Sequence, residues 1–136
     1  EYDTLVKQIE LLELSAHVNL LGRKDHKDIA SVLKTADIYV QYSIQEGFCN
    51  SVLEAQAMGM LCVVSDADGL VENIADGQTG WVVSKRNPIA LADKIQYVAK
   101  LRTSERDIIK NQAVKRVNER FSLSRQQKLF EDFYSN

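Results

Sequence analysis

Residues 38–64 read IYVQYSIQEGFCNSVLEAQAMGMLCVV and contain two apolar runs, 38–42 and 61–64. Both runs are rich in β-branched, aromatic or other apolar residues, which is typical of buried strands. Between them, a polar loop leads into a helix that we expect over residues 50–58, because Gly59 is a natural helix terminator. A strand, a helix and a second strand in this order predict two parallel strands joined by a helical crossover.

The same alternation continues on both sides of this stretch. Toward the N-terminus we expect a helix over 4–14, a strand over 18–22 and a helix capped by Asp25. Toward the C-terminus we expect a short helical stretch near 70–74, a brief strand at 81–83, and helices starting at Asn87-Pro88, Ser104 and Ser124. The predicted fold class is α/β: a Rossmann-like, doubly wound parallel sheet with helices on both faces and a C-terminal helical tail.

Composition limits the number of domains and the class of partner. With 136 residues and 45% hydrophobic residues, the chain is predicted to form a single domain over 1–136. Its net charge of −2, with both signs interspersed, argues against nucleic acid as a partner. The acidic start and the lack of a long apolar run favour a cytoplasmic location. Cys49 and Cys62 form no CxxC pair, which favours neither a disulfide framework nor a zinc site.

The loop after the run at 38–42 holds the densest set of functional candidates. In parallel α/β sheets, ligands bind beyond the carboxyl ends of the strands, and the amides at a helix start favour an anion such as phosphate. Glu46 precedes the expected helix and Glu54 lies one turn inside it. Since carboxylates repel phosphate, they should accept hydrogen bonds from hydroxyls on either side of it, which suggests a sugar, a diphosphate and a ribose. The alternative is that Ser51 and Glu54 form only a helix capping box.

The segment from Glu46 to Glu54 resembles the E-x7-E signature of retaining GT-B glycosyltransferases of family 4, the group 1 type. Five further segments resemble that family's strand, helix and loop motifs in the same order: 18–22, 36–40, 54–59 and the two loops 68–72 and 76–80. The resemblance covers residues 18–83, with a family-like helical tail beyond. It identifies the chain as similar to the C-terminal, nucleotide-sugar donor-binding domain of such an enzyme.

This resemblance implies a reaction and a set of residue roles. The full enzyme would transfer a hexosyl unit with retention from a nucleotide sugar, a UDP- or GDP-sugar, to a glycan or lipid-linked acceptor in polysaccharide biosynthesis, without a metal or other cofactor. The catalytic contact would be Glu46. The substrate-binding residues would be Gly47, Phe48 and Cys49 at the sugar and diphosphate, Asn50, Ser51 and Val52 at the phosphates, Glu54 at the ribose, Arg23 at the base and Glu72 at the phosphate loop.

The chain also departs from the family pattern. Tyr42 and Leu61 stand where the family often has proline, and Asp68 replaces one glycine of a Gly-Gly pair. The Arg and Lys that neutralise the leaving diphosphate in the family are not matched by Lys24, Lys85 or Arg86. We therefore expect a fragment that lacks the first strands of this domain and the N-terminal acceptor domain, and that transfers nothing by itself. The resemblance leaves open whether the complete enzyme binds peripherally at the inner face of the membrane.

Three other classes of protein share this architecture. A non-catalytic nucleotide-sugar-binding module would keep the same site and remains open. A sugar-nucleotide epimerase of related fold would not be expected to carry Glu46 and Glu54 in this register. A flavodoxin-like signalling domain would need paired acidic residues after its first strand, and none follow residues 18–22.

Overall fold

The computed structural model describes residues 2–122 and Arg125. The chain divides into two compact units, Glu1–Ser31 and Val32–Asn136, which are described separately. The helix predicted to start at Ser124 lies outside the described residues.

The first unit contains helix α1, Tyr2–Leu11, and the start of helix α2, His26–Leu33. Turns follow α1, in which the amide of Val18 donates to the carbonyl oxygen of Leu14 at 2.9 Å. The strand predicted over 18–22 is wrong: these residues have no regular structure, and the side chain of Leu21 is 51% exposed. A strand requires a hydrogen-bonded neighbour, and none of the described residues of this unit provides one.

The second unit is built on a parallel sheet of three strands in the order β1-β2-β3. The strands are β1, Ile38–Gln41; β2, Leu61–Ser65; and β3, Trp81–Val83. Val40 pairs with Val63 in one ladder, and Val63 pairs with Trp81 in the other. These three strands confirm the predicted parallel sheet, and β2 lies in its centre.

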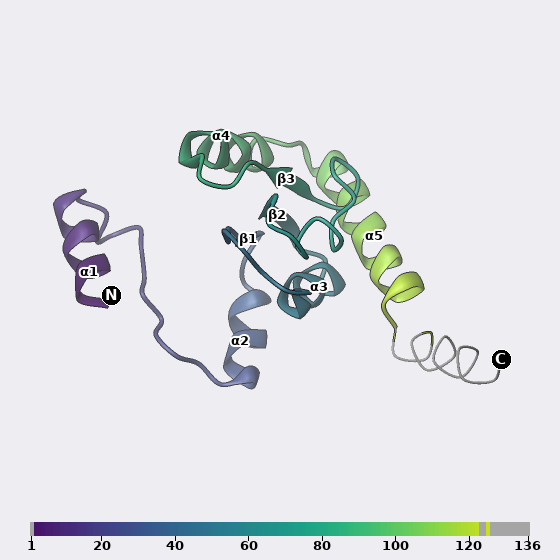
Figure 1. The fold of residues 1–136 in the computed structure, drawn as a ribbon, viewed down its shortest axis with the longest axis horizontal. Helices are drawn as coiled ribbons and strands as arrows, with labels where there is room; N and C mark the ends of the chain where they lie inside the picture. Colours follow the sequence, from purple (N-terminus) through teal and green to yellow (C-terminus); the bar gives the residue numbers. More distant parts are fainter. Residues whose placement is uncertain (1, 123–124, 126–136) are drawn as a thin grey trace. The chain divides into compact units, whose positions relative to one another are not determined.

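Every residue of β2 is buried, and alternate side chains enter two separate cores. Cys62 and Val64 pack with Val52 and Ala55 of helix α3 on one face. On the other face, the core is formed by Leu61, Val63, Trp81, Val83 and Val98. Figure 1 shows α3 and α4 on opposite sides of this sheet. The sheet is therefore covered on both faces, as the doubly wound prediction requires.

Three helices complete this unit: α3, Asn50–Ala57; α4, Pro88–Ala99; and α5, Thr103–Arg120. Helix α3 ends as predicted, because Gly59 has a φ of 73°, a left-handed conformation that favours glycine. Helix α4 has the expected start, where the Asn87 side chain accepts from the amide of Ala90 at 3.0 Å. Helix α5 begins near α4, contributes Ile109 to the second core, and then packs along α3 (Figure 1).

Two local predictions in this unit are wrong. Ser104 does not cap α5; the N-cap is Arg102, whose amide donates to the Glu105 carboxylate at 3.0 Å. The stretch 70–74 forms consecutive turns, with the Asn73 amide bonded three residues back to Leu70, so it does not complete a helix. Two of its three apolar side chains, Leu70 and Ile74, are buried all the same, and their spacing of four residues explains why the pattern resembled a helix. Among the described helices, none is both long and apolar enough for a membrane span.

Candidate functional site

The loops that follow the three strands are bonded together at the carboxyl edge of the sheet. Ser65, the last residue of β2, is fully buried, and its hydroxyl donates to the carbonyl oxygen of Ser43 at 2.5 Å. The same hydroxyl oxygen accepts from the Ser43 amide at 3.1 Å. This reciprocal pair fixes the start of the loop after β1 against the end of β2.

The loop after β2 approaches the loop after β1 more closely than any side chain allows. Gly69 has a φ of 82°, and a Cβ built on it would overlap the carbonyl group of Gly47. Residue 69 therefore has to be glycine for two reasons: the left-handed backbone and the space. Gly47, a predicted substrate-binding residue, is held in place by this contact.

The loop after β3 is bound through Tyr42, one of the departures from the family pattern. The Tyr42 hydroxyl donates to the carbonyl oxygen of Ser84 at 2.8 Å and accepts from the amide of Asn87 at 2.7 Å. Asp66 adds a second link, because its carboxylate accepts from the amide of Lys85 at 2.7 Å. A tyrosine at position 42 thus connects two loops that proline would leave unconnected.

Glu46 is half-buried in the first of these loops, and its carboxylate is held by two donors. One carboxylate oxygen accepts from the Gln41 side-chain amide at 3.0 Å and from the Ser43 hydroxyl at 2.8 Å. Gln41 is the last residue of β1, and Ser43 lies two residues after it. The second carboxylate oxygen remains for a ligand, so the carboxylate is oriented before any ligand binds.

The amino end of α3 is the feature of the site whose chemistry suits an anion. Its N-cap is Cys49, which makes no side-chain capping bond. The capping box considered for Ser51 and Glu54 is therefore wrong, since Ser51 is already the second residue of the helix. The helix starts with the amides of Asn50 and Ser51 left for another acceptor. The Val52 amide already donates to the Cys49 carbonyl at 3.2 Å, and the Val52 side chain lies in the core.

Ser51 and Glu54 extend the site along α3. The Ser51 hydroxyl lies 2.9 Å from the Tyr39 hydroxyl and 3.1 Å from the Cys49 sulfur. Burial raises the pKa of Tyr39, and the nearby Glu54 carboxylate contributes in the same direction. The Tyr39 phenol therefore stays protonated and acts as a hydrogen-bond donor here. The Glu54 side chain is exposed one turn from the helix start, where a ligand can reach it.

The turns at 70–73 support the helix start from behind. Buried Asn73 donates its side-chain amide to the carbonyl oxygen of Cys49 at 2.6 Å. The buried Gln56 side chain donates in turn to the carbonyl oxygen of Asn73 at 2.9 Å. Glu72 itself is exposed, and its backbone carbonyl accepts from Arg116 of α5 at 2.9 Å. Asn73, beside Glu72, therefore supports the helix start, and the predicted role of Glu72 stays a prediction.

Phe48 and Arg23 are two further predicted substrate-binding residues. The Phe48 ring lies 5.7 Å from the ring of Phe121 at the end of α5, so its side chain anchors the loop to that helix. Arg23 is exposed in the first unit, Glu1–Ser31, whereas the other predicted site residues belong to the second. Its predicted contact with the base stays a prediction.

Sequence reasoning missed several residues on which the site depends, among them Gln41, Ser43, Ser65 and Asn73. A signal exists for Gln41, because it is a polar residue at the end of an otherwise apolar strand. Ser65 and Asn73 carry no such signal, since they act through bonds 22 and 24 residues distant in sequence. Within the described part of the chain, no cluster of three or more His, Cys, Asp or Glu side chains is arranged to hold a metal ion.

Comparison with known proteins gives a family match over most of the chain. Residues 1–116 match the family model described as glycosyl transferases group 1. A Campylobacter jejuni protein named N,N'-diacetylbacillosaminyl-diphospho-undecaprenol alpha-1,3-N-acetylgalactosaminyltransferase is 37% identical over 99 residues, which cover 73% of this chain and 26% of that protein. D-inositol 3-phosphate glycosyltransferase of Mycobacterium tuberculosis is 32% identical over 120 residues, covering 88% and 25%. The chain spans about a quarter of the length of these relatives.

Solved structures extend the similarity to nearly the whole chain. Anabaena HepE in complex with UDP and glucose superposes with a TM-score of 0.87 at 25% identity, over 99% of this chain and 36% of that one. A glycosyltransferase from Rickettsia africae gives a TM-score of 0.88 at 28% identity, over 99% and 37%. The two-sided sheet is thus the arrangement found in these glycosyltransferases.

Proposed function

Because the chain belongs to the glycosyl transferases group 1 family, we propose that it binds the nucleotide-sugar donor of a retaining hexosyltransferase. In this proposal, the complete protein transfers the sugar to a glycan or lipid-linked acceptor and needs no metal ion. The observation that carries the proposal is the amino end of α3, which starts without a side-chain cap and is flanked by the carboxylates of Glu46 and Glu54. We assign only donor binding to this chain, since it spans about a quarter of its relatives.

Each part of the donor is matched by a group of suitable chemistry. The diphosphate would accept from the amides of Asn50 and Ser51, where the helix dipole favours negative charge. The ribose hydroxyls would donate to the exposed carboxylate of Glu54. The sugar hydroxyls would donate to Glu46, whose carboxylate is oriented by Gln41 and Ser43. We take UDP as the first nucleotide to test because HepE, a structural relative, is known in complex with UDP and glucose and with UDP-glucose.

The proposed reaction places opposite demands on the two ends of the scissile bond. As the bond between the anomeric carbon and the diphosphate oxygen breaks, positive charge develops on the sugar and negative charge on the leaving diphosphate. Glu46 would stabilise the first and the amides at the start of α3 the second. A new bond from the anomeric carbon to the acceptor hydroxyl oxygen would complete the transfer with the configuration retained, and the proton of that hydroxyl would pass to the leaving diphosphate. The N-acetylgalactosaminyltransferase relative is named for a lipid-linked diphospho-undecaprenol acceptor, which supports that acceptor class.

Calorimetric titration of the chain in the presence of a metal chelator tests the proposal. We expect UDP to bind, and Glu54→Gln to weaken UDP binding about tenfold, as for loss of a hydrogen bond to a charged group. Glu46→Gln should leave the UDP affinity unchanged and remove the additional affinity that UDP-glucose gains from its sugar. The matched control is Glu10→Gln in α1, an exposed glutamate of the first unit. GDP and ADP, titrated in parallel, identify the base.

The results separate the proposal from its competitors. Failure of every nucleotide to bind, or an affinity indifferent to Glu54→Gln, contradicts the donor site. Binding of UDP without any preference for its sugar conjugate contradicts the role given to Glu46 and favours a nucleotide-binding module.

A further inference from the structure

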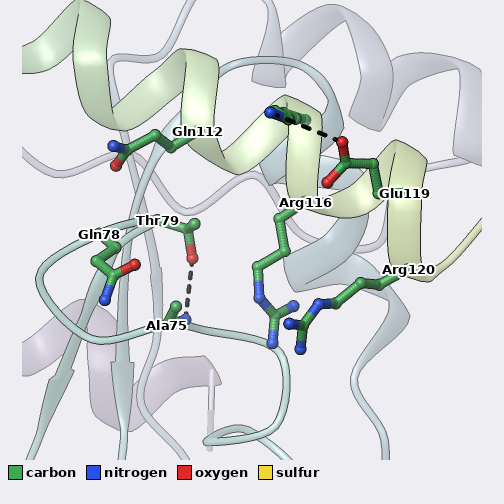
Figure 2. Close-up of a pocket in the computed structure, with 8 residues that line it drawn as sticks. Ala75, Gln78, Thr79, Gln112, Arg116, Glu119 and Arg120 are labelled. Atoms are coloured by element: carbon green, nitrogen blue, oxygen red, sulfur yellow. Dashed lines mark hydrogen bonds and ion pairs between the residues drawn. The ribbon is translucent and has the colours of Figure 1, made fainter.

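A cleft lies between the loop of residues 75–79 and helix α5, built from residues outside the proposed donor site. Its volume is about 300 Å³, and its lining includes the exposed amides of Gln78 and Gln112 together with two arginines, Arg116 and Arg120. Figure 2 shows both arginine side chains extending from α5 into the space beside the loop. The lining holds three cationic side chains against one carboxylate, although the chain as a whole carries a net charge of −2.

The single carboxylate of this cleft does not neutralise the arginines. Glu119 pairs with Lys115, its N–O distance being 3.8 Å on the exposed side of α5. Arg116 donates to the backbone carbonyls of Glu72 at 2.9 Å and Asn73 at 3.5 Å, which are neutral acceptors. Among the described residues, none forms a hydrogen bond or ion pair with the Arg120 side chain. Two full positive charges thus face the same space.

This arrangement is electrostatically unfavourable in the absence of a ligand. Arg116 and Arg120 are four residues apart on one helix, a spacing at which like charges repel. Burial lowers the pKa of Arg116, and the charge of Arg120 lowers it further. The helix dipole favours a cation in the last turn of α5, which accounts for the position of Arg120. It does not account for the guanidinium groups lying side by side, as Figure 2 shows them.

We propose that this cleft binds a phosphoryl group, which both guanidinium groups contact. A guanidinium presents its donors as a planar fork that matches two phosphate oxygens, and a phosphate dianion offsets the repulsion between two such groups. The side-chain amides of Gln78 and Gln112 supply further donors at the rim. The proposal is independent of the donor site, since none of the residues assigned to the nucleotide sugar lines this cleft.

The phosphoryl group has two sources with the same chemistry: a free phosphate or phosphomonoester, and the headgroup of an acidic phospholipid. We would titrate inorganic phosphate into the ¹⁵N-labelled chain at constant ionic strength and follow its amide resonances. In a second arm, the chain is sedimented with vesicles of phosphatidic acid in phosphatidylcholine, and with phosphatidylcholine alone. The first arm reports a soluble ligand and the second a membrane surface.

Arg120 is the residue to substitute, because its side chain makes no hydrogen bond in the described fold and its replacement should leave folding intact. We expect Arg120→Gln to weaken binding about tenfold in whichever arm is positive, and Arg120→Lys to weaken it less because the charge remains. The matched control is Arg102→Gln, the same change of charge about 27 Å away along the same helix, which should have no effect. Phosphate should shift the amides of Thr79 and Gln112.

Binding in either arm that Arg120→Gln reduces supports the proposal, and the positive arm identifies the source. The proposal is overturned if neither phosphate nor acidic vesicles bind, or if Arg120→Gln binds as tightly as the unmodified chain. It is also overturned if phosphate shifts only the amides of Asn50 and Ser51, because the ion then occupies the proposed donor site. A failed donor site would leave the result at Arg120 unchanged, so the two proposals fail separately.

Discussion

The side-chain amide of Asn73 donates to the carbonyl oxygen of Cys49 at 2.6 Å, and so joins the turns after β2 to the N-cap residue of α3. Asn73 is fully buried, and its own backbone carbonyl accepts from Gln56 and Arg116. One residue therefore connects the proposed phosphate-binding helix start to α5. The position of that helix start depends on bonds from outside its own loop.

Asn73→Ala should destabilise the chain by about 1 kcal/mol, because the Cys49 carbonyl loses its side-chain donor and keeps only the Val52 amide. We expect UDP affinity to fall as well, since the helix start loses its support. Chemical denaturation measures the first effect and calorimetry the second. Asn111→Ala, at an exposed position of α5, is the control and should change neither. Equal stability of the two variants would contradict the supporting role of Asn73.

Gly69→Ala tests the close approach of the two loops. The added Cβ would overlap Gly47 and would also sit on a backbone with a φ of 82°. The conformational cost alone is about 1–2 kcal/mol, and the overlap adds to it. Gly77→Ala provides a matched comparison, because Gly77 has a φ of 70° and no atom within 4 Å of the added Cβ. In urea denaturation, we expect Gly69→Ala to lose more stability than Gly77→Ala, and we expect only Gly69→Ala to weaken UDP binding. Similar losses of stability in the two variants would contradict a close contact between the loops.

Tyr42→Phe tests the tether between the loops after β1 and β3. Loss of the hydroxyl removes one donor and one acceptor, so the free energy of unfolding should fall by about 1–2 kcal/mol. Hydrogen exchange at the Asn87 amide should become faster, because that amide loses its acceptor. Tyr97→Phe is the control, since the Tyr97 side chain is 53% exposed. Unchanged exchange at Asn87 would show that the tether does not hold the loop.

The Cys62 thiol predicts a pH dependence of stability. Burial raises its pKa from 9.0 to about 12, so above pH 9 the unfolded chain loses this proton and the folded chain keeps it. The unfolded state then binds fewer protons, and the free energy of unfolding falls as pH rises from 9 toward 12, by up to about 1.4 kcal/mol per pH unit. Cys62→Ala removes this contribution. Urea denaturation at pH 8 and pH 10.5 should show the difference in stability between the two chains shrinking; a constant difference would contradict it.

The sequence correctly predicted elements that form a continuous apolar run and helix ends that depend on a single local residue. Strands β1 and β2 are runs of apolar residues buried by the sheet, and Gly59 and Asn87 define helix ends through their own backbone or side chain. The prediction of a strand at 18–22 was wrong because a strand forms only by hydrogen bonding to another strand. The pattern of apolar residues in 18–22 contains no information about that partner strand. The prediction of a helix at 70–74 was wrong because the spacing of its apolar residues reflects their burial and not helical hydrogen bonding.

The candidate site divides in the same way. Glu46, Gly47 and the first residues of α3 lie in one continuous loop, so sequence was sufficient to group them. The residues that hold this loop in place, Ser65, Gly69 and Asn73, come from later turns and act through contacts that no local pattern records. Tyr42 stood out only as a departure from the family pattern, and its two hydrogen bonds give that departure a structural reason.

The most direct test of the donor site is a map of amide chemical shifts as UDP is added to the ¹⁵N-labelled chain. We expect the largest shifts on the amides of Asn50 and Ser51, with smaller ones at Gly47 and Glu54, and we expect all of these shifts to shrink in Glu54→Gln. Shifts centred on the cleft of Arg116 and Arg120, or no shift at the start of α3 at saturating UDP, would contradict the proposed donor site.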